Sequence, residues 1–407
     1  MKEPARCRAC GQETVDLFSL GRIPPVNGFS ASSNSDNALP LDVVVCVNCW
    51  LCQLSEVPDP ELLFRDYKHF SGASKGNLQH LDSVATTLAL STPADRRARV
   101  LEIGCNDGSL MLRLRDRGYD CIGVDPAKNM QQVHEKTGLT VVYDFFDERL
   151  AADLLRSKGP FDAILALNVL AHFPTFMSAF KGIRLLLAPR GILHMEVANA
   201  TETLANGRFD TIYHEHVCNY TLTSIDAVLR LAGLRGIQAE KIDTQGGSLR
   251  VLAVRDDSDL KTSETYRNLI NEDKAQGVNT RSFYLTVKAR TEASIASLSN
   301  AYADFCRGGA PVLLLGAPAR GVVMCNSTVL RDFRHLHCID DTPAKHGCVI
   351  PGTSTPVGGW DLVKATGAAK AILLSWNYRE SMLTRLAGAG FTGRVLIPLP
   401  ETEIVTV

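Results

Sequence analysis

The sequence predicts an α/β protein with a Rossmann-like sheet at its centre, a small metal-binding unit before it and a second α/β domain after it. Two observations support this prediction. Short apolar runs alternate with polar, helix-permissive segments at intervals of about 20–30 residues in the middle of the chain, a rhythm typical of βαβ units with a parallel sheet. Five cysteines crowd into the first 52 residues, a loop-rich stretch too small for a good core, so a metal would stabilise it.

The strands expected in the central sheet are short apolar runs. They lie at 100–105, 121–126, 141–146, 161–170 and 191–198, and a last strand at 246–255 closes the sheet. Helical patterns precede and follow this region, at 61–95 and 259–305. The α/β alternation then resumes at 311–321, 335–341, 369–376 and 393–400. We therefore predict three domains, at residues 1–66, 67–258 and 259–407.

The composition is that of an ordinary globular protein. The 407 residues include 43 Lys and Arg against 44 Asp and Glu, so the net charge of −1 argues against nucleic acid as the main partner. No run approaches the roughly 20 apolar residues that span a bilayer, and the N-terminus lacks the apolar core of a signal peptide. We expect a cytoplasmic location with no membrane partner, and hence cysteines that are thiols or metal ligands.

Two C-x-x-C pairs, Cys7 with Cys10 and Cys46 with Cys49, predict one structural zinc site. Four thiolates hold Zn²⁺ tetrahedrally and leave no open position for catalysis. The alternative is a set of reduced cysteines without a metal. Cys52 could replace a neighbour as ligand, but the C-x-x-C spacing favours Cys46 and Cys49, and we interpret Cys52 as a small buried hydrophobic residue.

The segment VLEIGCNDGSL, residues 100–110, runs from a strand through two glycines into a helix, and a second strand ends at Asp125. Such glycines let the backbone approach a ligand, and an acid at that distance can take two ribose hydroxyls. The dinucleotide pattern G-x-G-x-x-G is not met, and E-x-G-x-x-x-G resembles motif I of class I S-adenosylmethionine (SAM)-dependent methyltransferases. An NAD-binding domain or a cofactor-free α/β fold are the alternatives.

The resemblance to motif I implies where SAM binds. Asp144 and Phe145 would flank the adenine, and Asn168 and His172, in NVLAHFP, would contact the methyl donor and the substrate. The implied cofactor-binding residues are Glu102, Gly104, Asn106, Gly108, Asp125, Asp144, Phe145, Asn168 and His172.

The segment FDTIYHEHVCNY, residues 209–220, places a carboxylate next to an imidazole, which is a pattern typical of a general base. A metal site is a weaker alternative, since no further ligand cluster lies nearby. In an extended backbone Tyr213 and Glu215 would share one face, and His214 and His216 the other. Glu215 and His216 could therefore cooperate directly only on a bent loop; otherwise each contacts a different part of the substrate.

The C-terminal segment LLLGAPARG, residues 313–321, is a strand-loop-helix entry with Gly316, Arg320 and Gly321. Helix N-terminal amides favour anions, so this loop is a candidate phosphate site, and Lys345 could add a positive charge. The alternative is a set of tight turns in a packing domain.

Together these segments resemble the sugar C-methyltransferases of bacterial deoxysugar pathways, in particular the tetronitrose C-3'-methyltransferase-like group. The likeness spans nearly the whole chain: the four cysteines match its zinc-binding domain, and VLEIGCNDGSL its class I SAM methyltransferase domain. The most specific matches are DTIYHEH (210–216), GGSLRV (246–251), LGAPARGVVMCN (315–326) and LSWNY (374–378).

The resemblance implies a SAM-dependent C-methyltransferase with one structural Zn²⁺ and a Rossmann-like C-terminal domain that binds a nucleotide sugar. The implied substrate is a nucleotide-linked, commonly dTDP-linked, 4-keto-deoxysugar. A base removes the proton next to the ketone, and the enolate takes the methyl group in line, leaving S-adenosylhomocysteine (SAH). The implied catalytic residues are His216 as the base, Glu215 and Tyr213 as its partners, and His69; the implied substrate contacts are Tyr67, Ser74, Arg320 and Lys345.

The chain departs from the family pattern at three places. His69 stands where the family has a second tyrosine near the reacting centre, Asn219 stands at another tyrosine position, and Arg320 replaces a lysine. Arginine keeps the charge but not the geometry. These changes concern the exact substrate, so two alternatives stay open: an O- or N-methyltransferase acting on another small metabolite, and a SAM-binding scaffold without catalysis.

Overall fold

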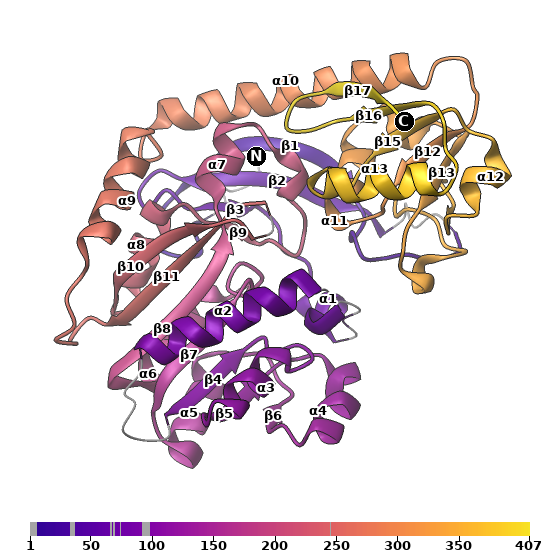
Figure 1. The fold of residues 1–407 in the computed structure, drawn as a ribbon. Coiled ribbons are helices and arrows are strands. Elements are labelled where there is room, and N and C mark those ends of the chain that lie inside the picture. The colour runs from indigo at the N-terminus through magenta and orange to yellow at the C-terminus, as the bar shows by residue number, and fades with distance from the viewer. Residues whose placement is uncertain are drawn as a thin grey trace.

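The computed structural model describes residues 6–32, 37–65, 67, 70–73, 75–91, 98–244 and 246–407. Figure 1 shows two α/β parts, with the N-terminal strands and the long helix α10 (Arg281–Phe305) running alongside both. Among the described helices, none combines the length and the apolar character that a membrane span requires.

The N-terminal sheet is antiparallel, and its fourth strand comes from the central part of the chain. Its strands are β1 (Thr14–Ile23), β2 (Leu39–Cys46), β3 (Cys52–Leu54) and β9 (Cys218–Asn219), in that order. Cys52 pairs with Asn219 and Gln53 with Cys218, and the amide of Leu54 donates to the carbonyl of Val217 at 2.9 Å. The zinc-binding unit therefore joins the segment that directly follows His216.

The central sheet has seven strands in the order β10-β11-β8-β7-β4-β5-β6. Their bounds are β4 (Arg99–Ile103), β5 (Asp120–Val124), β6 (Val141–Val142), β7 (Phe161–Leu167), β8 (Leu187–Ala198), β10 (Leu234–Ile242) and β11 (Ser248–Arg255). Strands β6, β5, β4, β7 and β8 are parallel, as predicted. The closing strand β11 is instead antiparallel to β8, because a tight hairpin joins it to β10.

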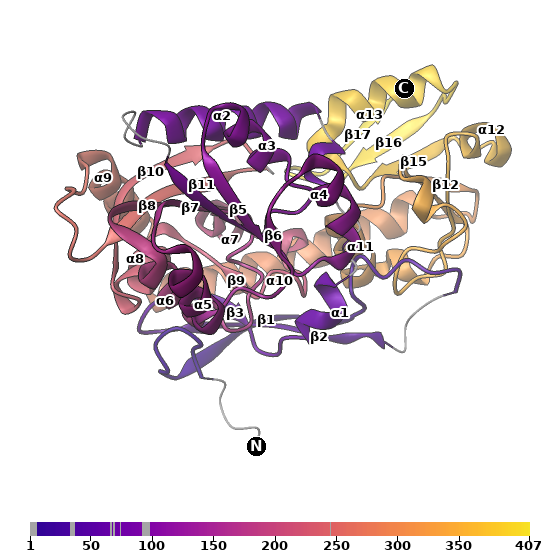
Figure 2. The ribbon, with the colours of Figure 1, turned by 90° about the horizontal axis from the view of Figure 1, so that it is seen from below.

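Helices cover both faces of this sheet, as Figure 2 shows. On one face lie α2 (Lys75–Ser91) and α3 (Ser109–Asp116). On the other lie α5 (Glu148–Lys158), α6 (Phe176–Leu186) and α8 (Leu222–Leu231). Burial from both sides explains why residues 161–166 of β7 are all buried and form a nearly continuous apolar run. The short helices α1 (Pro60–Phe64), α4 (Gln131–Thr137) and α7 (Ala200–Ala205) lie in the connections.

The C-terminal part, reached through α9 (Glu264–Ala275) and α10, is a second Rossmann-like sheet, in the order β14-β13-β12-β15-β16-β17. Its strands are β12 (Val312–Leu315), β13 (Leu336–Ile339), β14 (Val357–Gly358), β15 (Lys370–Leu373), β16 (Arg394–Ile397) and β17 (Glu403–Thr406). Its helices are α11 (Ala319–Ser327), α12 (Leu362–Thr366) and α13 (Arg379–Gly388). The predicted fold class is thus confirmed.

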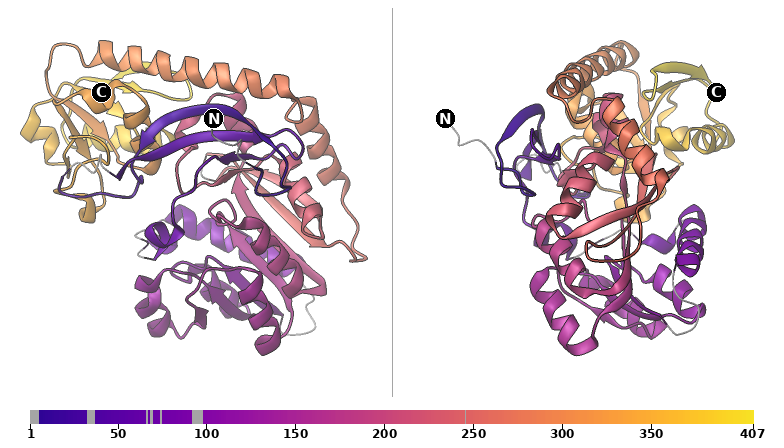
Figure 3. Two further views of the ribbon diagram at one scale, coloured as in Figure 1. Left: turned by 180° about the vertical axis from the view of Figure 1, so that it is seen from behind. Right: turned by 90° about the vertical axis from the view of Figure 1, so that its left-hand side faces the viewer.

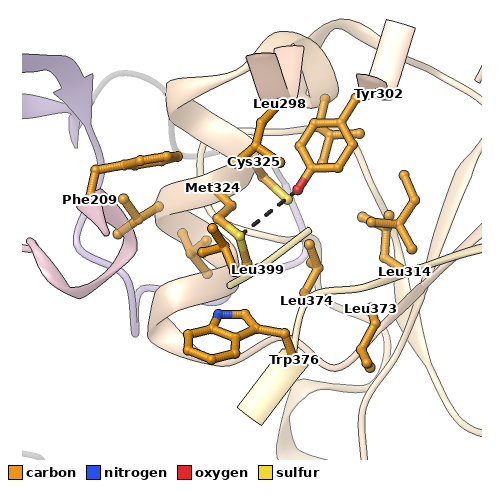
Figure 4. Close-up of a cluster of buried hydrophobic side chains, with 14 of the residues drawn as sticks. Phe209, Leu298, Tyr302, Leu314, Met324, Cys325, Leu373, Leu374, Trp376 and Leu399 are labelled. Atoms are coloured by element: carbon orange, nitrogen blue, oxygen red, sulfur yellow. Dashed lines mark hydrogen bonds between the residues drawn. The ribbon is translucent and has the colours of Figure 1, made fainter. Parts of the chain in front are cut away.

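One apolar core joins the C-terminal part to α10, to the N-terminal sheet and to the segment that leads into Tyr213. In Figure 4, Phe209 lies at one side of this cluster. Tyr302 of α10, Met324 of α11 and Trp376 form other parts of the same cluster. Figure 3 shows the N-terminal strands beside α10 in the view from behind. The segment that leads into Tyr213 is therefore packed against all three parts of the chain.

Gly316 offers a test of the C-terminal sheet. Its φ is +86°, and a Cβ there would lie 1.9 Å from Oγ of Ser375 at the end of β15. We expect Gly316→Ala to lower the free energy of unfolding by roughly 2–4 kcal/mol. Gly388→Ala is the control, because a Cβ there meets nothing within 4 Å. Thermal unfolding checks both; equal stability of the two variants would contradict the packing described here.

Candidate active site

A cavity of about 480 Å³ opens at the carboxyl ends of the central strands, where ligands bind in open α/β sheets. All three parts of the chain line it. The N-terminal part contributes Asn27, the central part contributes the Gly104 turn and the Tyr213–His216 segment, and the C-terminal part contributes Pro318, Ala319 and Lys345.

The turn after β4 is built so that the backbone faces this cavity. Gly104 has φ +71°, and a Cβ there would lie 2.7 Å from Cγ2 of Val169. Gly108 has φ +76°, and a Cβ there would lie 2.2 Å from Cδ1 of Leu139. Asn106 between them also has a positive φ, of 49°. Neither glycine tolerates a side chain, so a ligand can reach the backbone closely.

Acidic side chains lie next to the turn after β4. Asp125 accepts hydrogen bonds from the amides of Asn106 and Ala127, both at 2.8 Å, and lines the cavity. Burial raises its pKa. Burial, aided by Asp125 and Asp107, also raises the pKa of Glu102, whose Oε2 has no partner among the described residues. An orphaned carboxyl oxygen and a ribose-binding acid at a close-approach turn fit SAM.

The other predicted cofactor residues lie around the same cavity. Asp144, Phe145, Asn168 and His172 all line it. Asn168 has φ +54°, and its amide donates to the carbonyl of Glu196 at 2.8 Å. The ring of His172 stacks between Phe64 and His216, with centroid distances of 5.6 and 5.3 Å.

The Tyr213–His216 segment is a tight turn, closed by the amide of His216 donating to the carbonyl of Tyr213 at 2.8 Å. Nδ1 of His216 lies 2.9 Å from the carbonyl of Thr211, which can only accept, so Nδ1 carries the hydrogen. Nε2 then accepts from the hydroxyl of Tyr213 at 2.8 Å when the ring is neutral. The turn therefore holds Nε2 of His216 as the basic atom.

Glu215 points to other partners. Nδ2 of Asn27 donates to its Oε1 at 2.5 Å, and the hydroxyl of Tyr67 to its Oε2 at 3.4 Å. His214 is buried and donates from Nε2 to the carbonyl of Pro40 at 3.2 Å. The loop is bent, yet Glu215 does not bond to His216, in contrast to the pairing implied by the family motif.

Burial sets the protonation of these groups. It lowers the pKa of His216 to about 4 and that of His172 to about 3, so both rings are neutral near pH 7. It raises the pKa of Glu215 to about 7, although Asn27 and Tyr67 oppose this shift. It also raises the pKa of the Tyr213 hydroxyl, against the nearby charge of Arg320. The neutral imidazole of His216 can therefore accept a proton, and the protonated hydroxyl of Tyr213 can donate a hydrogen bond.

The predicted substrate contacts fall in different places. Tyr67 and Lys345 line the cavity, and Nζ of Lys345 donates to the carbonyl of Ala317 at 2.9 Å and pairs with Asp340 at 3.2 Å. The guanidinium of Arg320 lies over the Trp376 ring at 5.8 Å, beside the cavity. His69 and Ser74 lie outside the described residues.

Sequence reasoning missed two groups. Asn27 holds Glu215 from 188 residues away, and His80 of α2 lines the cavity while its Nε2 meets Oε2 of Glu196 at 2.6 Å. Neither lies in a motif of adjacent residues. In the sequence, Asn27 is a single polar residue in a loop and His80 is a single histidine in a predicted helix, and neither pattern by itself indicates a site.

The four predicted zinc ligands come together. All four sulfurs lie within 4.8 Å of one another, and the shortest separations are 3.5 Å for Cys7–Cys49 and for Cys10–Cys46. Tetrahedral Zn–S bonds of about 2.3 Å place sulfurs about 3.8 Å apart. The residues therefore fit a zinc ion. Cys52 lies apart, buried in β3.

Three protein families match successive parts of this chain. Residues 7–64 match a zinc binding domain family, 79–239 a methyltransferase domain family, and 243–400 the C-methyltransferase C-terminal domain family. C-methyltransferase NovU of Streptomyces niveus is 28% identical, over 98% of this chain and 96% of its own length. The chain thus carries, in order, matches to a zinc-binding domain, a methyltransferase domain and a C-methyltransferase C-terminal domain. It is SAM-dependent and carries a zinc-binding domain.

Two other similar proteins each cover less than half of this chain. A ubiquinone biosynthesis O-methyltransferase of Xanthomonas campestris is 28% identical over 31% of this chain and 51% of its own length. The magnesium protoporphyrin IX methyltransferase of Synechocystis, solved with SAM, is 21% identical over 44% of this chain and 80% of that one, with a TM-score of 0.33.

Zinc removal tests the link between the N-terminal sheet and the active site. The wild type should hold about one zinc per chain by elemental analysis, and we expect Cys46→Ser to lose this zinc. Turnover should fall more than SAH affinity, because displacing a catalytic group by 1 Å costs on the order of 100-fold while the Gly104 turn lies in another sheet. Cys348→Ser, outside the cluster, is the control. Unchanged turnover in the metal-free variant would contradict the link.

Glu215→Gln tests the buried carboxyl. The pKa of Glu215 rises from its usual 4.5 to about 7 in the folded protein, so the unfolded chain loses this proton first as the pH rises. The wild type should lose stability between about pH 4.5 and 7, by on the order of 3 kcal/mol at about 1.4 kcal/mol per pKa unit. Glu215→Gln should lack this loss, and the exposed Glu380→Gln should keep it. Denaturant unfolding at several pH values measures the free energy of unfolding of each protein. If that free energy changed with pH in the same way in all three, the raised pKa would not belong to Glu215.

Proposed function

We propose that the protein methylates the carbon next to the ketone of a nucleotide-linked 4-keto-deoxysugar. One observation carries this proposal: the half-buried Tyr213–His216 pair and the Gly104 turn line one cavity. A substrate in that cavity would meet a neutral base on one side and the methyl donor on the other. Orienting both groups against one carbon supplies much of the catalysis.

SAM, bound at the Gly104 turn, supplies an electrophilic methyl group. The hydroxyl hydrogen of Tyr213 would first turn away from Nε2 of His216, which frees the lone pair that receives the proton of the substrate carbon. The Nδ1–H stays on the carbonyl of Thr211, and the oxygen of Tyr213 then accepts from the new Nε2–H. Glu215 and Tyr67, hydrogen-bonded to each other on the same wall, would bind sugar hydroxyls. A positioned base of this kind contributes about 10²–10⁴-fold.

The C-terminal domain, residues 259–407, would bind the nucleotide. Lys345 and the N-terminus of α11 reach the cavity wall and would supply positive charge and helix N-terminal amides, which suit a diphosphate. Arg320, over Trp376, adds charge nearby. The nucleotide carrier that the family resemblance favours is dTDP.

Proton exchange separates this function from O- or N-methylation. The protein, loaded with SAH, would be incubated with dTDP-4-keto-6-deoxyglucose deuterated next to the ketone, and with its UDP- and GDP-linked analogues. We expect loss of deuterium to water and, with SAM, a C-methylated product detected by mass spectrometry. His216→Asn should lose both by about 10²–10⁴-fold while binding SAM normally.

Tyr213→Phe, with the exposed Tyr378→Phe as control, should lower exchange because the His216 ring loses its hydrogen-bond donor. Methylation of an oxygen or nitrogen without any exchange would favour the O- or N-methyltransferase. SAM binding without turnover of any of the sugars would favour a scaffold.

A further inference from the structure

A second imidazole, His80, lines the cavity from the first helix of the central domain. Its side chain is 13% exposed, and Nε2 lies 2.6 Å from Oε2 of Glu196, whose side chain is fully buried. A carboxylate can only accept, so Nε2 carries a hydrogen. Nδ1 makes no hydrogen bond with any described residue.

The carboxylate behind His80 belongs to a charge network across three strands. Oε1 of Glu196 in β8 accepts from Nε of Arg250 in β11 at 2.7 Å, and Arg250 also donates to Glu240 in β10 at 2.8 Å. His194 lies 3.5 Å from Glu196, with both ring nitrogens unbonded among the described residues. Two carboxylates and one guanidinium leave one negative charge next to Nε2 of His80.

The proposed reaction needs a group of this kind. The enolate oxygen that forms when the carbon is deprotonated must be stabilised by a donor or a cation. His216 cannot serve, because its Nδ1–H is held by Thr211 and its Nε2 receives the proton. His172 is neutral, so it offers one N–H but no positive charge, and its ring is stacked between two others. His80 lines the same cavity and has a free ring nitrogen.

We propose that His80 is a catalytic residue that acts as the imidazolium: its Nε2–H stays on Glu196, its positioning residue, and its Nδ1–H donates a hydrogen bond to the ketone oxygen. This inference rests on the proposed function. When the C–H bond breaks, its proton goes to His216 and its electron pair forms the C=C bond, while the carbonyl π electrons move to the oxygen facing His80. On methyl transfer the C=O bond re-forms, the sulfonium C–S bond pair stays on sulfur, and His80 is unchanged.

The test uses His80→Gln and His80→Ala in the full chain. Gln79→Ala, exposed on the same helix, is the control. Each would be assayed for deuterium loss with SAH and for methylation of dTDP-4-keto-6-deoxyglucose. We expect kcat to fall by about 10²–10⁴-fold in both His80 variants, with a small change in KM and in SAM affinity. Added imidazole should restore part of the activity of His80→Ala, which a purely structural role would not allow.

Glu196→Gln tests the positioning role, because it keeps an acceptor for Nε2 and removes the charge. We expect kcat to fall with SAM binding intact. Wild-type turnover within twofold in His80→Gln, or a loss that follows weakened SAM binding, would overturn the inference. If the wild type itself neither exchanges nor methylates these sugars, the proposed function fails instead, so the two failures are distinct.

Discussion

The active site depends on the pairing of β3 with β9. This short ladder attaches the zinc-binding unit to the residues directly after His216, and Asn27 and Pro40 of the same unit hold Glu215 and His214. A turn of four residues cannot position its side chains alone, because backbone freedom costs about 1–2 kcal/mol per residue. The metal-binding unit thus helps to position the turn that we propose carries the base.

Burial determines the chemistry of that turn. The desolvation that keeps His216 neutral also keeps Tyr213 protonated and raises the pKa of Glu215 to about 7. Each shift disfavours a charge, so the wall around the substrate carbon is nearly neutral until charge develops there. Ionised groups also lie beside the cavity, and they are paired: Glu196 with Arg250 in one network, and Lys345 with Asp340 in another.

Local patterns were predictable from the sequence and distant contacts were not. The strands, the cofactor turn and the zinc cysteines each form a pattern within a few residues, and the structure contains all three. The partners of Glu215 and Glu196 lie 188 and 116 residues away. Their spacing along the chain carries no signal of proximity. The antiparallel β11 escaped prediction for a similar reason, since an apolar run looks alike in either direction.

The two α/β parts share one backbone arrangement after their first strand, but the aspartate of that arrangement has a different role in each part. In each, a glycine after the first strand donates to the end of the second strand: Gly104 to Val124 at 2.8 Å and Gly316 to Ile339 at 2.7 Å. In each, an aspartate there accepts an amide of that turn at 2.8 Å. Asp125 also faces the cavity, whereas Asp340 binds Lys345. The carboxylate that can hold a ribose in one part therefore fixes an ammonium group at the cavity wall in the other, where an anionic substrate would meet it.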